Sequence, residues 1–147
     1  MTDRDQRLTF VILWLFALFN YIYGDIGMIF SLFVSPEQLE RLRQGLTAGG
    51  RTDLYFLAGA VLMEIAFLAM LLSWLATHRW ARRVNIFAGI LFTLVMAALL
   101  LAPLTRGNPP PLNYYSFCAV VEIIATVAIT WRAWKWRSAG AEDRAGP

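Results

Sequence analysis

Residues 8–34 read LTFVILWLFALFNYIYGDIGMIFSLFV. Thr9 is the only polar residue among the first twelve, and a stretch this apolar is long enough to cross a membrane as an α-helix. A single helix over the whole stretch would be about 40 Å long, whereas the hydrocarbon core is about 30 Å thick. We therefore expect it to tilt, protrude or break. Gly24 and Gly27 mark the expected break, because glycine weakens a helix interior, and residues 28–34 would form an interfacial or re-entrant segment.

Three further apolar runs extend the pattern over the rest of the chain. With the first span at about 8–30, they predict crossings at about 54–75, 84–101 and 113–131. The chain is 59% hydrophobic with a mean hydropathy of +0.54, which is too apolar for one soluble core of 147 residues. We therefore predict an all-α integral membrane four-helix bundle forming one domain over residues 1–147, with loops at 47–53 and 102–112 and a polar tail at 138–147.

A short amphipathic helix is predicted between the first two spans, at about 35–45. Ser35 is suited to capping its start, Pro36 to its first position, and Gln38 to completing a capping box. Its leucines fall on one side and its charged residues on the others. Because it is too short to cross the bilayer, we expect it to lie on the membrane surface.

Basic residues indicate the orientation of the spans. The N-terminal tail, the predicted turn at 76–83 and the segment from Arg132 onward carry nine Lys and Arg, whereas 35–53 and 102–112 carry four. The excess of basic residues on one side predicts that both termini are cytoplasmic. The segment WRAWKWR, at 131–137, is typical of an interfacial anchor, and 76–83 is expected to be a basic turn.

Three carboxylic acids interrupt the apolar runs, and no Lys or Arg lies inside any of the four predicted spans. Counting 1.5 Å per residue places Asn20, Glu64 and Glu122 near the midplane, with Asp25 nearer the outer boundary. Candidate ligand- or proton-binding residues are the three acids and the polar residues expected beside them: Asn20, Tyr23, Asp25, Glu64, Thr93, Glu122 and Thr126.

Two interpretations of these acids stay open. Ionisable groups inside a membrane are costly and usually functional, which favours a ligand or proton site. Alternatively, the acids are structural and share hydrogen bonds between helices. Asp25 has a third interpretation, since interfacial water or the cap of a helix that begins after Gly24 would also account for it.

Helix packing is predicted from two spacings of four residues. Asn85, Gly89, Thr93 and Ala97 form a small, weakly polar face that favours close approach of another helix. Cys118, Glu122 and Thr126 share one face of the last span.

Other chemistry finds little support in the sequence. His78 lies in a basic segment with no second metal ligand nearby, and is expected to be solvated. Cys118 is expected to pack rather than react, because the apolar spans contain no histidine to activate it. No phosphate-binding glycine loop or metal-ligand motif is present, so no cofactor is identifiable and an enzyme is not favoured. A basic stripe with stacking aromatics, which nucleic-acid binding would require, is also missing.

Several segments resemble a family of small bacterial four-helix membrane proteins of unknown function. They are LWLFALFNYIYGDI, AGAVLMEIAFLAM, RRVNIFAG, and VEII followed by WRAWKWR. The broader layout also resembles DoxX-type membrane proteins, in which a glutamate follows small residues in a middle helix. The first resemblance implies a four-helix fold in the bacterial cytoplasmic (inner) membrane and no assigned activity. The second implies a link to quinone or redox partners.

Two functions follow as hypotheses. The first is a carrier-like protein with a buried acidic centre that binds a small molecule or a proton. The second is a non-transporting interaction or accessory subunit of a membrane redox or quinone-linked complex. The expected partners are the lipid bilayer, a small-molecule or proton ligand, and a second copy or another membrane protein.

Overall fold

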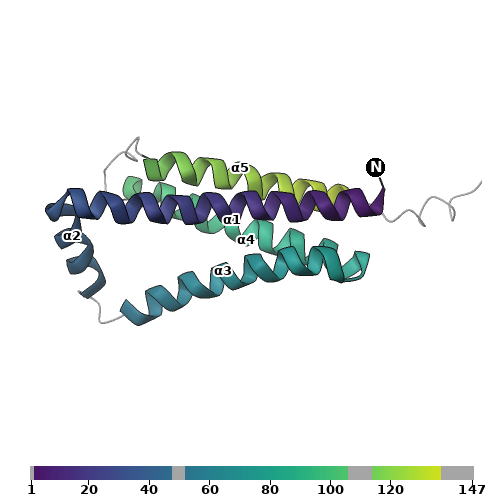
Figure 1. The fold of residues 1–147 in the computed structure, drawn as a ribbon, viewed down its shortest axis with the longest axis horizontal. Coiled ribbons are helices and arrows are strands. Elements are labelled where there is room, and N and C mark those ends of the chain that lie inside the picture. Colours follow the sequence, from purple (N-terminus) through teal and green to yellow (C-terminus); the bar gives the residue numbers. More distant parts are fainter. Residues whose placement is uncertain (1, 48–51, 106–113, 137–147) are drawn as a thin grey trace, which may run out of the picture.

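The computed structural model describes residues 2–47, 52–105 and 114–136, and these residues form five helices and no strand. Four of the helices are long and apolar enough to cross a membrane, which makes the chain an all-α, multi-pass type of membrane protein. Figure 1 labels the helices in chain order. Their bounds are α1 Asp3–Val34, α2 Pro36–Thr47, α3 Thr52–Leu75, α4 His78–Thr105 and α5 Tyr114–Lys135.

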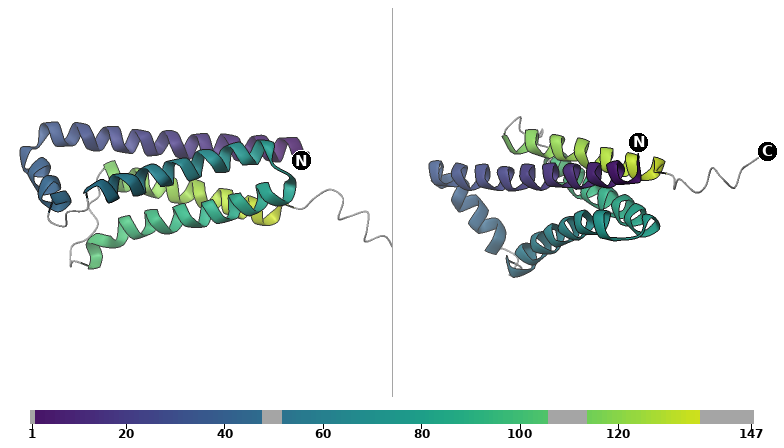
Figure 2. Two further views of the ribbon diagram at one scale, coloured as in Figure 1. Left: turned by 90° about the horizontal axis from the view of Figure 1, so that it is seen from below. Right: turned by 45° about the vertical axis from the view of Figure 1, so that its right-hand side comes forward.

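The long helices form an uneven bundle. Helices α1 and α5 run side by side, and α4 packs against α5 and crosses behind α1 in the view of Figure 1. Helix α3 packs against α1 and α4 at the end where α1 begins, and diverges from α1 toward the end where α2 lies (Figures 1 and 2). We call these two ends of the bundle the basic end and the α2 end. Helix α2 crosses from the end of α1 toward the start of α3.

The predicted break in the first helix is wrong, because α1 is continuous for 32 residues. Its two central glycines are contact points instead. A Cβ on Gly24 would lie 3.6 Å from Cys118 Cβ, and a Cβ on Gly27 would overlap the ring of Tyr114. Glycine is therefore required at Gly27 for the Tyr114 ring of α5 to approach α1, whereas Gly24 only makes ordinary contact with α5, and this packing offsets the helix-weakening effect of glycine.

The other helices extend the predicted spans. Helix α2 confirms the short helix after Ser35, and α3 begins two residues before the predicted span. The predicted basic turn at 76–83 is largely wrong, since only 76–77 interrupt the helices and α4 already begins at His78. Helix α5 continues through most of the predicted anchor segment, to Lys135. Most of the predicted 102–112 loop and the 138–147 tail lie outside the described residues.

A buried polar cluster holds three helices together at the basic end. The indole nitrogen of Trp14 donates to Asn85 Oδ1 at 2.7 Å, and Asn85 Nδ2 donates to Ser73 Oγ at 2.7 Å and to the carbonyl of Ala81 at 2.8 Å. All three side chains of this Asn85 cluster (Trp14, Ser73 and Asn85) are fully buried. Trp14 is therefore a core residue joining α1 to α4 and not an interfacial anchor.

The same end contains a second unexpected arrangement. Arg7 of α1 donates from Nη1 to the backbone carbonyls of Ser73, Trp74 and Ala76, which caps the end of α3. Trp136 is buried, with its ring centroid 5.2 Å from that of Phe10 and 4.4 Å from that of His78. These contacts fix the ends of α1, α3, α4 and α5 relative to one another.

Helices α4 and α5 meet along the predicted small-residue face. A Cβ on Gly89 would overlap Thr130 Oγ1 and lie 3.0 Å from the backbone oxygen of Thr126. Four residues further along, the hydroxyls of Thr93 and Thr126 are 2.8 Å apart. The spacing of four residues therefore correctly indicated the face that α4 presents to α5, and this close contact places Thr126 and Glu122 inside the bundle.

Candidate functional site

Glu122 is the buried acid of the bundle, with 5% of its surface exposed. It lies on the face of α5 that carries Cys118 and Thr126, which are also buried, as the spacing predicted. Asn20 of α1 reaches this face and donates from Nδ2 to Glu122 Oε1 at 3.2 Å and to the backbone oxygen of Cys118 at 3.0 Å. Asn20 and Glu122, which were predicted to lie at the same depth, are therefore in direct contact.

The second carboxyl oxygen of Glu122, Oε2, is buried and has no hydrogen-bond partner among the described residues. Buried polar atoms are nearly always paired, so an unpaired one calls for a water, an ion or a proton. Glu122 borders two small cavities, of about 10 and 20 Å³. A cavity of roughly 10–15 Å³ is the least that holds a water molecule, so this space is suited to one or two waters.

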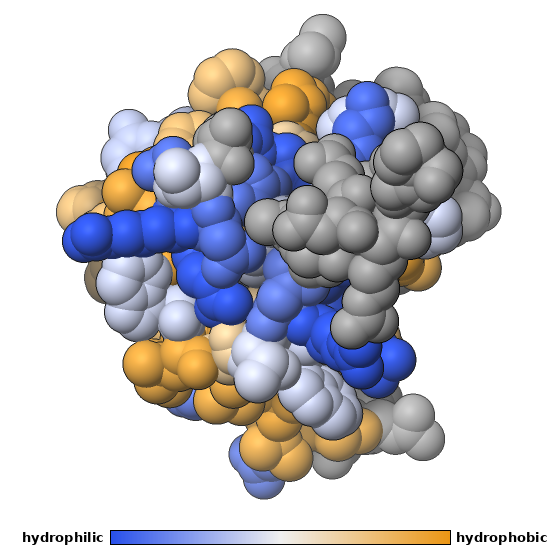
Figure 3. All heavy atoms as spheres, turned by 90° about the vertical axis from the view of Figure 1, so that its right-hand side faces the viewer, coloured by the Kyte–Doolittle hydropathy of each residue, from blue (hydrophilic) through white to orange (hydrophobic). Residues whose placement is uncertain are grey.

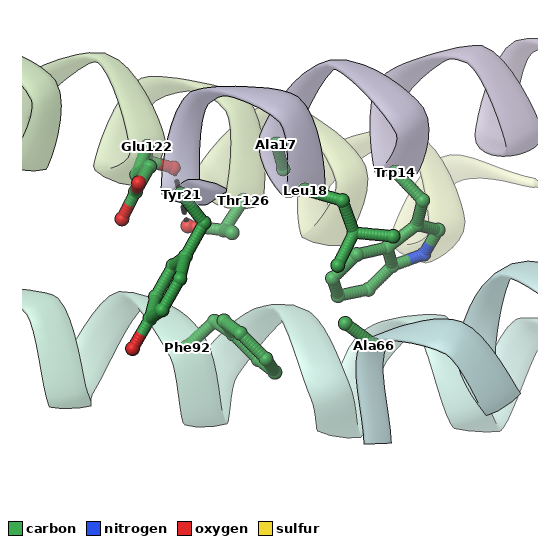
Figure 4. Close-up of a pocket in the computed structure, with 8 residues that line it drawn as sticks. All are labelled: Trp14, Ala17, Leu18, Tyr21, Ala66, Phe92, Glu122 and Thr126. Carbon is green, nitrogen blue, oxygen red and sulfur yellow. Dashed lines mark hydrogen bonds between the residues drawn. The ribbon is translucent and has the colours of Figure 1, made fainter. Parts of the chain in front are cut away.

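The first cavity extends from Glu122 toward the Asn85 cluster. Figure 4 shows Glu122 and Thr126 at one side and Trp14 at the other, with Leu18 and Phe92 between them. Ala66 of α3 closes the cavity beside Trp14. Apolar side chains thus fill most of the space between Glu122 and the basic end, which leaves little room for water in that direction.

The second cavity lies toward the α2 end. Its lining includes Tyr21 and Asp25 from α1, and Tyr115 and Glu122 from α5. Asp25 is exposed, so it connects this cavity to the surface of the bundle. Tyr21 lines both cavities. Sequence reasoning missed both tyrosines, and Tyr115 lies near the start of a predicted span, where tyrosines are commonly interfacial anchors.

Of the three predicted intramembrane acids, only Glu122 is buried. Glu64 is exposed and lies on the side of α3 turned away from Ala66, which faces the first cavity. The expectation that Glu64 and Glu122 share a buried acidic centre is therefore wrong. The residues on the same face of α3 as Glu64 are apolar, as are most of those on its other faces. Such a sequence does not indicate which face of a membrane helix is turned toward the other helices.

Tyr23 and Thr93 also lie apart from the carboxyl group. Tyr23 is exposed, and its backbone oxygen accepts a 2.7 Å hydrogen bond from the hydroxyl of Tyr114. Thr93 donates to the backbone oxygen of Gly89 and meets Thr126 at the contact between α4 and α5. Both residues hold helices together in the described structure.

Cys118 and His78, the other two reactive side chains considered from the sequence, both pack against neighbouring residues. Cys118 is buried, as expected of a packing residue. His78 is half-buried against Trp136 rather than fully solvated. Within the three described ranges, no group of three or more His, Cys, Asp or Glu side chains is arranged to hold a metal ion.

The fold and this site define a class: small multi-pass helical membrane proteins with one buried carboxylic acid in the bundle. The chain belongs to a family of unknown function, DUF6326, whose model matches residues 1–142. This confirms the resemblance to a family without assigned activity, whereas the likeness to DoxX-type proteins is not shown. No curated protein and no solved structure matches the chain.

Proposed function

We propose that Glu122 takes up and releases a proton inside the membrane, and that the protein is carrier-like, with this acid as its proton-binding site. The observation that carries the proposal is that Oε2 of Glu122 is buried without a partner, in a residue that lines two water-sized cavities. A protonated carboxyl group donates one hydrogen bond, whereas an ionised one only accepts. Water in the adjacent cavity is able to act as either partner.

The size of the cavities favours a proton over an organic ligand. Volumes of about 10 and 20 Å³ hold single waters, whereas sites for small organic molecules occupy about 300–1,000 Å³. The proton is therefore the ligand that fits Glu122 without rearrangement of the helices. A second solute would have to bind elsewhere on the bundle or after the helices separate.

The proposed proton route runs from the α2 end, because Asp25 borders the cavity on that side and is exposed. The distribution of basic residues favours the α2 end as the outer side of a bacterial cytoplasmic membrane, with both termini cytoplasmic. A reporter fused after residue 147 should then give a cytoplasmic signal. A periplasmic signal would reverse the direction of the route.

Infrared difference spectroscopy of the purified protein tests the proton site. The carboxyl C=O band of Glu122 should change between about pH 4 and pH 10, a range that covers ordinary and strongly shifted carboxyl groups. Glu122→Gln should remove this change and still fold, because glutamine keeps the shape of the side chain and an oxygen that accepts from Asn20.

Glu64→Gln is the matched control, since Glu64 is an acid in another spanning helix but is exposed. It should leave the Glu122 band unchanged. A spectrum in which no pH-dependent carboxyl band disappears with Glu122→Gln would exclude a proton site and leave a structural hydrogen bond as the role of this residue.

A second candidate function is a non-transporting interaction subunit, favoured by the position of Glu64. This acid lies on the exposed face of α3, between the exposed residues Val61 and Leu68. A carboxyl group facing lipid is costly, so a partner helix would stabilise this face by covering it. A photoreactive amino acid at position 68 should then cross-link to protein within the membrane. Exclusive labelling of lipid would argue against this function.

A further inference from the structure

An apolar groove lies on the outer surface of the bundle, between α4 and α5. Its volume is about 430 Å³. Helix α4 contributes Ile90, Thr93 and Leu94, and α5 contributes Val127, Thr130, Trp131 and Trp134. The groove is on the opposite side of the Thr93–Thr126 contact from the Glu122 site, so it is independent of the proposed proton site.

The groove continues into a basic hollow toward the basic end of the bundle. Trp131 and Trp134 line both, and Arg82 and Lys135 complete the lining of the hollow, which measures about 710 Å³. The described residues that line the two hollows include no carboxylate. Figure 3 views the bundle from this end and shows hydrophilic residues across the middle of the uncovered face, with hydrophobic residues above and below them.

The two cations of the hollow are held in place by α5. Arg82 donates from Nε to the backbone oxygen of Ala133 and from Nη2 to that of Trp134, both at 3.1 Å. A guanidinium group has five N–H donors, so further donors remain for an anion. The ammonium of Lys135 lies 4.2 Å from the centre of the Trp131 ring, a cation–π contact that fixes it at the edge of the groove.

The length of the combined surface corresponds to one leaflet of a bilayer. Leu94 comes twelve positions after Arg82 in α4, which corresponds to about 18 Å along the helix. Half of the ~30 Å hydrocarbon core is about 15 Å. Trp131 and Trp134, which are 60% and 66% exposed, lie where the basic and apolar parts meet, as tryptophan does at membrane interfaces.

We propose that this surface binds one anionic phospholipid. Arg82 and Lys135 hold its phosphate, the two tryptophans flank its glycerol region, and an acyl chain lies in the groove between α4 and α5. Charge complementarity selects the lipid class, because basic pockets between membrane helices attract anionic head groups, whereas the apolar groove alone would accept the chain of any lipid.

Native mass spectrometry of the full-length, delipidated protein in neutral detergent tests the proposal. The probes are 1-palmitoyl-2-oleoyl phosphatidylglycerol and the corresponding phosphatidylcholine. The protein should retain one phosphatidylglycerol molecule more tightly than phosphatidylcholine. Lys135→Gln should weaken this retention about five-fold, the factor expected from the loss of one basic residue near a lipid head group. Lys135→Arg should restore it.

Three further variants separate the effect of the groove from general effects of charge and surface. Leu94→Trp should lower phosphatidylglycerol retention several-fold by filling the groove, and Leu94 is 63% exposed, so the bundle loses little packing. Arg83→Gln removes a cation at the same end whose guanidinium lies near Trp80, and Leu68→Trp enlarges an exposed leucine of α3. Both controls should retain the lipid as the unmodified protein does.

Three results would overturn the proposal. Equal retention of the two lipids would show that the hollow does not select an anion. An Arg83→Gln effect as large as that of Lys135→Gln would show diffuse attraction to the whole basic end. A dimer that Leu94→Trp dissociates would show that a second copy of the chain, and not a lipid, occupies the groove.

Discussion

The Asn85 cluster and the Glu122 site both bury polar atoms between helices, yet they differ in how fully those atoms are bonded. At Asn85 the carboxamide oxygen accepts from Trp14, and the nitrogen donates to both Ser73 and Ala81. At Glu122 one carboxyl oxygen accepts from Asn20 and the other has no partner in the described structure. A fully bonded cluster specifies one arrangement of helices, whereas a half-bonded one retains the capacity to bind something further.

The surroundings of the two clusters reinforce this difference. Aromatic rings and small residues close around the Asn85 cluster, and Trp14 has its ring centroid 5.6 Å from that of Phe92. Small cavities border Glu122, and one of them is lined by the exposed Asp25. Within one bundle, the polar atoms at the basic end are therefore fully bonded and closely packed, whereas those in the middle border small cavities.

The largest effect is expected from Asn85→Ala. This change removes the two hydrogen bonds that join α4 to α1 and α3 and a third within α4, and it leaves a cavity beside the buried Trp14. We expect the free energy of unfolding in mixed micelles to fall by about 3 kcal/mol. Asn20→Ala, which removes two bonds at the Glu122 site, should cost only about 1 kcal/mol. Equal losses would remove the distinction between the two regions.

A smaller effect is expected from Gly89→Ala, at the contact of α4 with α5. The added methyl group would overlap Thr130 Oγ1 and press on the backbone of Thr126, so the helices would have to separate. We expect a loss of about 2 kcal/mol by the same measurement. Gly59→Ala in α3 is the control, because a Cβ there meets nothing within 4 Å and alanine favours helix. A neutral Gly89→Ala would contradict the close crossing.

The smallest change in stability is expected from Glu122→Gln. Glutamine keeps an oxygen that accepts from Asn20, and its amide group can meet cavity water where Oε2 lies unpaired. We expect the free energy of unfolding to change by less than about 1 kcal/mol. A loss as large as that of Asn85→Ala would assign Glu122 the structural role that the Asn85 cluster has.

The sequence predicted the four apolar helices, because length and hydropathy are set locally along each helix. It also identified the α5 face containing Glu122, since a spacing of four residues places side chains on one side. It did not predict the outward position of Glu64 or the burial of Trp14. Both depend on how each helix is rotated about its axis, and a helix apolar on all sides carries little information about that rotation.

Neighbouring helices also explain the wrong break in α1. The prediction rested on the intrinsic helix propensity of glycine, whereas the absence of a side chain at Gly27 is explained by the Tyr114 ring of α5 that packs against it. Likewise, the basic character of 76–83 suggested a turn, although Ala81 is fully buried and Arg82 bonds to α5. These are tertiary contacts, which override local preference and are not visible in a single sequence.

Hydrogen bonds from α1 and α4 hold the last turns of helix α3. Arg7 and the Asn85 cluster make these bonds, whereas Leu54 and Leu57 in the first turns of α3 are exposed. Its 24 residues span about 36 Å, so a 10° rotation about its last turns would move its start by about 6 Å. Ala66 lies nearer the last turns and would move far less, so such a rotation would leave the Asn85 cluster intact.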